Sequence, residues 1–384
     1  MSLEYALAMK FTQPAAAREI NRLRVLNLLA NEKEYSRADI ARNLKLNKPS
    51  TSEIVEQLLK DGLVEETGKR ETTTGRRPVA IALIADAALV LGVDMGSRNT
   101  SIALADLKGN ILRFERFPTT EQPEVKELCS SVIRILRKMA KLTTSPILGV
   151  VVALDGVIGE DKQTLIRSDH WKWNDVPLAA IIEKNTNLPT LLIHNVEAMV
   201  FAERWVAHEE EENFFFVNWG EHIKSAWVNK NSITGGDTQF GHLMITNTGL
   251  CRCGKIGCLE SVAAGWALSE KHEGKTVKQL CLEPNETINK DLKQAAEAMG
   301  MALVAASAIT GCNKIILGGG LANLDNEYQQ YLKDFYREHS NREKIEIVCS
   351  ELGEKQTLLG SIAIALDSWM FKSSLLEMMQ NQGH

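Results

Sequence analysis

The stretch "ALVLGVDMGSRNTSIALADLKGNI" (residues 88–111) has the pattern of a strand, a glycine turn and a second strand that ends in a hairpin. The same plan returns 124 residues later in "NFFFVNWGEHIKSAWVNKNSIT" (residues 213–234). In this alignment Asp94 corresponds to Asn218, Gly96 to Gly220, and Ser101 to Ser225. Two such openings, each followed by helical segments, predict a duplicated α/β architecture with two lobes and a ligand cleft between them.

Length and composition describe a globular protein with more than one domain. The chain has 384 residues, of which 44% are hydrophobic and 24% are charged, and one hydrophobic core seldom extends through a chain of this length. No run of about 18 apolar residues predicts a membrane span, and the N-terminal sequence lacks the pattern of a signal peptide. Seven cysteines without the spacing of a disulfide framework are typical of a reducing compartment. We therefore expect a cytoplasmic protein without membrane contact.

The net charge of −5 is unevenly distributed along the chain. Residues 1–80 contain 14 Lys and Arg against 11 Asp and Glu, whereas residues 81–384 contain 30 against 38. The mildly basic N-terminal segment can accept a polyanion, and the acidic remainder repels one. Any contact with nucleic acid is therefore expected in the first 80 residues.

Three short helices are predicted near the N-terminus. The segment "REINRLRVLNLLANE" (residues 18–32) carries apolar residues along one helical stripe. Ser36 and Asp39 form a capping-box pattern at the start of a second helix. A third helix is expected to begin near Asn47, with Pro49 in its first turn. The tight turn between the second and third helices predicts a helix-turn-helix.

The third helix and the segment after it carry the side chains expected to read DNA. Short polar groups at the start of a recognition helix suit base edges in the major groove. The next segment, "GLVEETGKRETTTGRRPVAIAL" (residues 62–83), predicts two strands around a basic tip, which is a wing that can touch phosphates or a minor groove. The predicted DNA contacts are Lys48, Ser50, Thr51, Ser52, Lys69, Arg70, Arg76 and Arg77. A small helical bundle used for dimerisation, with a solvated basic loop, is the alternative.

Three cysteines lie within eight residues in "CRCGKIGCLE" (residues 251–260). Together with His242, Cys251, Cys253 and Cys258 offer one imidazole and three thiolates. The glycines between the last two cysteines allow a short loop to wrap tightly around an ion. Four nitrogen and sulfur ligands without an open position suit structural zinc rather than a catalytic ion. Reduced cysteines that line a core, or a redox sensor, are the alternatives.

The helix-turn-helix, the duplicated hairpins and the cysteine cluster together resemble the ROK family (repressor, open reading frame, kinase) over nearly the whole chain. The resemblance implies an α/β protein with an N-terminal winged helix-turn-helix over residues 15–83. A two-lobed, actin-like (ribonuclease-H-like) ROK domain would follow over residues 88–384. The resemblance also implies that His242 and the three cysteines bind a structural Zn²⁺ in a loop over residues 242–258.

Family motifs also imply where a sugar would bind. The segment "SDHWKWNDVPL" (residues 168–178) is similar to the family's Asn-Leu-Pro-Gly-Trp stretch. Asp155 follows a predicted strand and is expected to face the same cleft. The implied sugar contacts are Asp169, Asn195, Gln239, His242 and Glu260, of which Asp169 and Gln239 replace the family's Asn and Glu. We expect zinc to hold this wall of the pocket rigid.

The groups that transfer phosphate in the family's kinases are altered. The family's catalytic base lies in an Asn-Asp-Ala-Asn stretch, and the matching "HNVE" places Asn195 at the position of the Asp. An amide cannot take a proton at neutral pH, but it can hydrogen-bond a sugar hydroxyl. Two of the three glycine-rich phosphate loops have also changed, at residues 94–98 and 220–226, whereas residues 318–320 keep their glycines. We therefore expect no useful ATP turnover.

These observations predict a transcriptional regulator, expected to be a repressor of carbohydrate-metabolism genes. Its partners would be double-stranded operator DNA, a sugar or sugar derivative as effector, and further copies of itself in a homodimer or tetramer. A sugar kinase with an appended DNA-binding head is one alternative, and sugar-dependent ADP release would favour it. A protein-binding module that senses metabolism and a transcriptional activator are the others.

Overall fold

The computed structural model describes residues 14–30, 34–69, 79–168, 170–230, 232–236, 238–283, 285–323, 326–342 and 344–372. The chain divides into two compact units, each built from several segments. The first unit combines Met1–Val152, Pro177–Leu191 and Ile362–His384, and the second combines Ala153–Val176 and Leu192–Ser361.

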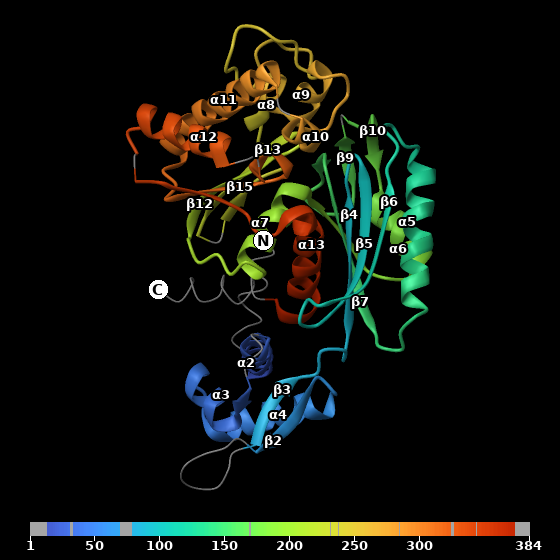
Figure 1. The fold of residues 1–384 in the computed structure, drawn as a ribbon. Helices are drawn as coiled ribbons and strands as arrows, with labels where there is room; N and C mark the ends of the chain where they lie inside the picture. Colours follow the sequence, from blue (N-terminus) through green and yellow to red (C-terminus); the bar gives the residue numbers. More distant parts are fainter. Residues whose placement is uncertain are drawn as a thin grey trace, which may run out of the picture. The chain divides into compact units, whose positions relative to one another are not determined.

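The first unit begins with the predicted helix-turn-helix (Figure 1). Its elements are α2 (Pro14–Leu29), β1 (Tyr35–Ser36), α3 (Arg37–Leu44), α4 (Lys48–Lys60), β2 (Val64–Lys69) and β3 (Val79–Leu83), with strand order β1-β3-β2. The capping box is present, since Ser36 Oγ accepts from Asp39 N and the Asp39 carboxylate accepts from Ser36 N. Leu26, Ile40, Val55 and Leu58, which come from all three helices, are completely buried. The predicted wing residues Arg70, Arg76 and Arg77 lie outside the described residues, as does the side chain of Lys69.

The turn between α3 and α4 is fixed by backbone and side-chain hydrogen bonds. Lys45 ends α3 with a left-handed φ of 53°, and Leu46 N then donates to Ala41 O at 2.9 Å. Arg24 of α2 donates to Leu44 O at 2.8 Å. These contacts hold the start of α4 in place relative to the other two helices of the head.

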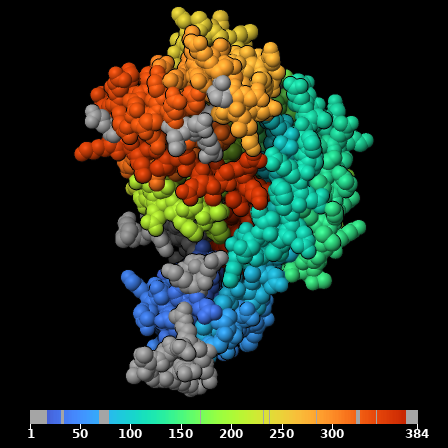
Figure 2. All heavy atoms as spheres, viewed as in Figure 1, coloured from blue at the N-terminus to red at the C-terminus, as the bar shows by residue number. Residues whose placement is uncertain are grey.

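The rest of the first unit is a mixed sheet with helices packed against it (Figure 1). The sheet has the order β11-β7-β4-β5-β6 and comprises β4 (Leu89–Met95), β5 (Asn99–Asp106), β6 (Ile111–Pro118), β7 (Ile147–Leu154) and β11 (Thr190–His194). Two helices, α5 (Val125–Ala140) and α6 (Leu178–Thr186), cover one face, and Figure 2 shows α5 at the surface in the teal-green part of the chain. The β4-β5 hairpin confirms the strand, turn and strand predicted for residues 88–111.

The second unit repeats this plan around a second sheet. Its order is β14-β13-β12-β15-β16, with β12 (Asn213–Trp219), β13 (Ile223–Asn229), β14 (Ser232–Thr234), β15 (Lys314–Gly318) and β16 (Glu346–Cys349). A smaller sheet has the order β10-β9-β8, with β8 (Val157–Ile158), β9 (Leu165–Ser168) and β10 (Trp173–Val176). The helices are α7 (Asn195–Trp205), α8 (Glu260–Ala263), α9 (Gly265–Lys271), α10 (Val277–Leu282), α11 (Glu286–Thr310), α12 (Asn326–His339) and α13 (Gln356–Leu366). The chain continues from α13 as a π-helical turn, η4 (Asp367–Phe371), which belongs to the first unit.

The apolar run "FFFV" in β12 is buried on both faces because helices cover both sides of the second sheet. Phe215 and Val217 belong to one core cluster with residues of α11, whereas Phe214 and Phe216 pack with Val196 and Val200 of α7. This division follows the two-residue period of a strand. A continuous apolar run of this kind is typical of a strand covered on both faces.

The two hairpins pair in registers that differ by one residue. Asp94 pairs with Ser101 in the first hairpin, but Asn218 pairs with Lys224 in the second. The alignment of Ser101 with Ser225 therefore does not extend to the pairing of the strands. The second hairpin has the shorter turn, and this difference sets the position of the side chains that follow Gly220.

In the part of the chain that the structure describes, no helix has both the length and the apolar character needed to cross a bilayer.

Candidate functional site

Four side chains of the types that bind metal ions meet in the second unit. His242 ends the short 3-10 helix η1 (Phe240–His242), and Cys251, Cys253 and Cys258 come from the loop that follows. The four ligand atoms all lie within 4.8 Å of one another. Cys251 Sγ is 3.7 Å from His242 Nδ1, and Cys253 Sγ is 3.7 Å from Cys258 Sγ. A tetrahedral site with Zn–S bonds of about 2.3 Å has S···S edges of about 3.8 Å, so the four residues fit such an ion.

The metal loop can close this tightly because glycine occupies position 257. Gly257 has a φ of +83°, and a Cβ atom there would lie 1.9 Å from Thr246 O. Cys251 and Cys258 are each 2% exposed, whereas Cys253 is at the surface. A cluster of four protein ligands, two of them buried, has the composition of a closed structural site.

Glu260 links the metal loop to the β12-β13 hairpin. It begins α8 two residues after the last cysteine, and its side chain is 5% exposed. Oε1 accepts from Ile223 N at 2.7 Å, and Oε2 accepts from Trp266 Nε1 at 3.3 Å. Burial alone would raise the pKa of Glu260, but His222, whose Nδ1 lies 3.5 Å from Oε1, and the Ile223 amide bring the pKa below its usual value. Both oxygens of this predicted sugar contact therefore already have protein partners.

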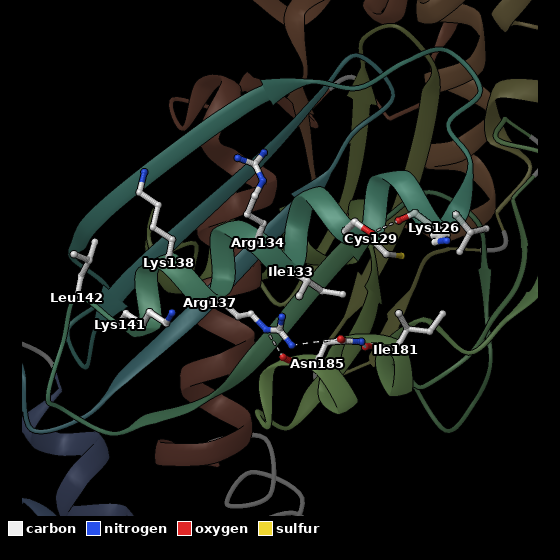
Figure 3. Close-up of a pocket in the computed structure, with 12 residues that line it drawn as sticks. Lys126, Cys129, Ile133, Arg134, Arg137, Lys138, Lys141, Leu142, Ile181 and Asn185 are labelled. Atoms are coloured by element: carbon white, nitrogen blue, oxygen red, sulfur yellow. Dashed lines mark hydrogen bonds between the residues drawn. The ribbon is translucent and has the colours of Figure 1, made fainter.

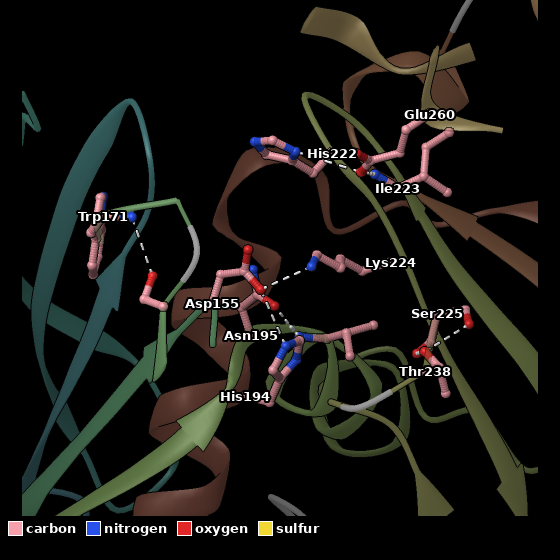
Figure 4. A network of polar contacts seen from close by, with 12 residues as sticks. Asp155, Trp171, His194, Asn195, His222, Ile223, Lys224, Ser225, Thr238 and Glu260 are labelled. Carbon is pink, nitrogen blue, oxygen red and sulfur yellow. Dashed lines mark hydrogen bonds and ion pairs between the residues drawn. The ribbon is translucent and has the colours of Figure 1, made fainter. Parts of the chain in front are cut away.

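A second polar cluster lies beside Asn195 (Figure 4). Asp155 follows β7, His194 ends β11, and Lys224 belongs to β13. His194 Nε2 lies 3.3 Å and Lys224 Nζ lies 3.2 Å from Asp155 Oδ1. Burial raises the pKa of Asp155, but the hydrogen bond from His194 and the charge of Lys224 outweigh it and hold the pKa well below the usual range. Because its side chain is 32% exposed, the ionised Asp155 can also accept a hydrogen bond from a ligand hydroxyl.

The start of α7 fixes the hydrogen-bonding roles of His194 and Asn195. His194 Nδ1 accepts from Val196 N at 3.2 Å, so this nitrogen carries the lone pair and Nε2 carries the proton that faces Asp155. Asn195 Oδ1 also accepts from Val196 N, at 2.8 Å. The NH₂ group of Asn195 is therefore its donor toward a ligand.

Trp171 Nε1 and His222 Nε2 are buried in the same region and have no hydrogen-bond partner among the described residues. Trp171 is 4% exposed, and its ring centroid lies 4.8 Å from that of Trp173. A buried polar atom without a partner costs about 1–3 kcal/mol, and such atoms are uncommon in native proteins. A ligand with several hydroxyl groups is the type of molecule that could satisfy them.

The remaining predicted sugar contacts are placed as follows. Gln239 is exposed immediately before η1, and His242 directs Nδ1 toward Cys251. Asp169 lies outside the described residues. A cavity of about 170 Å³ adjoins His194 and is lined by Gly156, Ile158, Gly159, Glu160, Lys162, Leu192, Ile193, His194, Glu197, Gly235 and Gly236.

The sequence alone did not identify His222 and Lys224 as candidate site residues, because residues 220–226 resemble the family only as an altered phosphate loop. The structure places His222 against Glu260 and Lys224 against Asp155. The two residues are two positions apart around the start of a strand, where alternate side chains share a face. Two basic side chains with that spacing were the signal that could have identified them.

Packing within the second unit explains the first two glycines of the triplet at residues 318–320. A Cβ atom at Gly319 would lie 2.5 Å from Asn218 Oδ1, and one at Gly318 would lie 2.7 Å from the Phe216 ring. Gly319 also has a φ of +89°. The close approach of β15 to β12 therefore requires these glycines whether or not a phosphate binds there.

Asp94, at the end of β4, occupies the first altered phosphate loop. Burial raises the pKa of Asp94 to about 7, and the charge of Arg116 only partly offsets this effect. The folded protein therefore holds a proton that the unfolded chain releases between about pH 4 and pH 7. The stabilisation that comes from this proton is complete at low pH and is lost as the pH rises through about 7.

We expect Asp94→Asn to raise the melting temperature relative to the wild type at pH 8, and to do so much less at pH 5. The reason is that the amide keeps the shape of the protonated carboxyl but cannot ionise. Thermal unfolding of both proteins at the two pH values measures the difference. An equal shift in melting temperature at pH 5 and pH 8 would show that the native carboxyl is already ionised.

In the head, α4 presents some of its predicted DNA contacts but not all. Lys48 is exposed at the first position of the helix, and Ser50 and Ser52 are half-buried. Asn47 caps the helix, since its Oδ1 accepts from Ser50 N at 2.8 Å. The prediction for Thr51 is wrong, because Thr51 is fully buried and its hydroxyl donates to Asn47 O at 3.0 Å. Thr51 begins the i, i+3, i+4, i+7 stripe with Ile54, Val55 and Leu58, which places it on the core face.

Comparison with known proteins finds a family match for the N-terminal helix-turn-helix and another for the rest of the chain. The model of the ROK family matches residues 90–368, and a model described as "Bacterial regulatory protein, arsR family" matches residues 21–66. The xylose repressor of Caldicellulosiruptor bescii is 24% identical, and the alignment covers 92% of this chain and 97% of that protein. The DNA-binding transcriptional dual regulator NagC of Escherichia coli is 22% identical, with 95% and 96% covered.

Solved structures show the same fold. A ROK family transcriptional regulator, described as a homologue of the Escherichia coli MLC protein, superposes with a TM-score of 0.78 at 20% identity, over 94% of this chain and 99% of that one. A ROK family glucokinase from Streptomyces griseus, solved with glucose and AMPPNP, gives a TM-score of 0.60 at 17% identity, over 72% and 98%. The predicted α/β fold class, a helix-turn-helix followed by an actin-like ROK domain, is confirmed. Because the family model spans most of its length, this chain belongs to the ROK family.

Proposed function

We propose that this protein is a sequence-specific DNA-binding transcriptional regulator, a repressor of carbohydrate-metabolism genes, whose ROK domain binds a sugar or sugar derivative. The observation that carries the proposal is that one chain combines a helix-turn-helix with a ROK domain. The family resemblance adds that Asn195 stands where the kinases have their catalytic base. Relatives that align over more than 90% of the chain are named as repressors or regulators. The sugars in such names, xylose and N-acetylglucosamine, support a monosaccharide or its derivative as the effector.

The hydrogen bonds at the start of α7 leave its imidazole and amide groups unable to act as the base of a phosphoryl transfer. A kinase needs a base that takes the proton of the sugar hydroxyl. Asp155 and His194 resemble such a base with its orienting carboxylate, but the lone pair of His194 Nδ1 already accepts from Val196 N. His194 Nε2 faces Asp155 as a donor, and the Asn195 amide is not basic. None of these imidazole and amide groups can act as the base.

We expect neither the wild type nor Asn195→Asp to form ADP above background with any hexose or pentose. Asn195→Asp restores the base, but the altered loop at residues 220–226 still lacks the glycines that admit phosphate. A coupled ADP assay over a panel of sugars measures turnover. Sugar-dependent turnover by the wild type at ordinary enzyme rates, about 1–10³ s⁻¹, would favour the sugar-kinase alternative instead.

The sugar contacts that we propose are Asp155, Asn195, His222 and Lys224 together with the predicted Asp169, Gln239, His242 and Glu260. Asp155 would accept from a hydroxyl, and the Asn195 NH₂ would donate to one. Trp171 Nε1, which has no partner among the described residues, would donate to a ring or hydroxyl oxygen. A few convergent polar groups beside an aromatic surface are typical of small-ligand sites.

Asp155→Asn tests this arrangement. The sugar that gives the largest thermal shift in a panel is expected to bind to the variant at least about 10-fold more weakly. The reason is that the variant loses a charged hydrogen-bond acceptor. Asp291→Asn is a matched control, because Asp291 also lies beside a histidine and a lysine, His272 and Lys271, outside the site. Equal sugar affinity in wild type and Asp155→Asn, measured by calorimetry, would remove Asp155 from the site.

The four-ligand cluster would hold Zn²⁺ as a structural ion. When bound, the ion would fix the loop that ends at Cys258 and thereby the position of Glu260. Glu260 in turn receives the Ile223 amide at 2.7 Å, so the loop also supports the hairpin that carries His222 and Lys224.

The proposed regulation is a population shift. A homodimer or tetramer would present two heads to two operator half-sites about one helical turn apart. A sugar that binds one arrangement of the body more tightly than the other shifts the spacing of the heads. Because coupling between two ligands is reciprocal, operator DNA would change sugar affinity by the same factor.

A further inference from the structure

The first unit carries a groove of about 880 Å³ between α5 and α6 (Figure 3). The described residues that line it include no acidic side chain. Five of them are basic, namely Lys126, Arg134, Arg137, Lys138 and Lys141. The apolar lining consists of Val125, Cys129, Ile133, Leu142 and Ile181. None of these groups takes part in the proposed sugar or operator sites.

Two of the five cations are held in place by the protein, and three are not. Arg137 Nε donates to Asn185 O at 2.6 Å, and Lys138 Nζ lies 2.7 Å from Glu115 Oε1. The charged ends of Lys126, Arg134 and Lys141 have no partner among the described residues, and all three side chains are exposed. Along α5 these three residues span 15 positions, or about 22 Å at 1.5 Å per residue. The groove therefore has a row of unpaired positive charge about four helical turns long.

The apolar residues form a floor below this charge. Cys129 is 3% and Ile133 is 8% exposed, and the two lie one helical turn apart on the same face of α5. Burial raises the pKa of the Cys129 thiol to about 11, so the thiol is neutral and contributes apolar surface. Leu142, at the C-terminal end of the groove, is 58% exposed. A complementary ligand would be apolar on one side and negatively charged on its flanks.

We propose that the α5-α6 groove binds an acidic amphipathic helix of a partner protein. A helix laid in a groove places apolar side chains, spaced i, i+3, i+4 and i+7, on the floor and its acidic side chains against the rim. Complementary charge of this kind gives a protein interface its specificity and its rate of association.

Other occupants fit the groove less well. A second copy of α5 would bring five cations against five cations, which is unfavourable. Duplex DNA offers no apolar surface to cover Ile133 and Ile181, since protein–DNA interfaces are polar and wet. A membrane surface requires an apolar face that can enter the lipid, whereas Ile133 lies at the bottom of the groove and is 8% exposed.

Fluorescence anisotropy with the full-length protein tests the proposal. The probe is a labelled 18-residue peptide of Leu, Ala and Glu with its leucines on one helical face. A peptide of the same composition with its leucines scattered around the helix is the control ligand. We expect the amphipathic probe to bind at least 10-fold more tightly than the scattered peptide, with an affinity that falls as salt increases.

Variants of the protein locate the binding site. Arg134→Glu with Lys141→Glu should weaken probe binding at least 10-fold, and Ile181→Gln should weaken it with no change of charge. Lys278→Glu with Lys290→Glu, at exposed positions of α10 and α11, makes the same change of charge elsewhere and should alter affinity less than 2-fold. The proposal is overturned if the probe fails to bind the wild type, if it binds the Arg134/Lys141 variant equally well, or if nonspecific duplex DNA or anionic vesicles compete for the groove as effectively as unlabelled probe.

Discussion

Replacing Cys258 with serine is expected to lower the melting temperature by more than 10 °C and to abolish sugar binding. Cys258 is 2% exposed, and its Sγ lies 3.7 Å from Cys253 Sγ. Structural zinc sites contribute about 10–16 kcal/mol of apparent binding free energy in zinc-finger peptides, and loss of one thiolate removes much of it. Since α8 begins directly after this loop, Glu260 and the Ile223 amide that it binds would lose their fixed positions.

Cys281→Ser is the matched control for this variant. Cys281 is partly buried but lies outside the four-ligand cluster, so its replacement should change the melting temperature by only a few degrees. Differential scanning calorimetry and metal analysis of both variants provide the measurement. A Cys258→Ser protein that contains no metal yet melts and binds sugar like the wild type would contradict a structural role for the metal loop.

Lys48→Glu is expected to weaken operator binding by about 10-fold for each head, or about 100-fold for a dimer. Lys48 is exposed at the first position of α4, where the helix N-terminus also favours a phosphate. A glutamate there would replace attraction with repulsion. The loss should be similar for operator and nonspecific DNA. The slope of log affinity against log salt concentration should fall by the equivalent of about one phosphate contact for each head.

Lys60→Glu makes the same change of charge at the other end of α4, where Lys60 is exposed in the last turn. This control should retain operator affinity within about 3-fold. Gel-shift titrations at several salt concentrations, with an operator selected from random duplexes, provide the measurement. Equal losses at Lys48 and Lys60 would mean that α4 does not enter DNA by its N-terminus.

The fold of this chain could largely be predicted because its periodic patterns and caps act locally. The Ser36–Asp39 capping box, the duplicated hairpins and the cysteine loop each involve residues close together in the sequence. The one-residue difference between the hairpin registers could not be predicted, because it depends on how the turn after Gly220 packs. The prediction for Thr51 was wrong because a hydroxyl at the start of α4 suits a DNA contact, whereas the position of Thr51 in the apolar stripe of α4 buries it.

The candidate site was harder to predict because its residues meet only after folding. Asp155 follows β7, and His194 and Lys224 belong to β11 and β13. Their ion pairs depend on contacts between separate strands. From the sequence alone, the changes at residues 220–226 indicated only that this segment no longer binds phosphate. With Glu260 and Asp155 in place, the same loop contributes two basic side chains to a polar site.

The most direct test of the central claim is the affinity of the full-length protein for its operator with and without a saturating sugar effector. The sugar is first identified by thermal shift, and anisotropy of labelled operator then gives both dissociation constants. The proposed function predicts a change of at least about 5-fold, with no ADP formed when ATP is added. A sugar that binds tightly but leaves operator affinity unchanged, or that is phosphorylated at enzymatic rates, would contradict the claim.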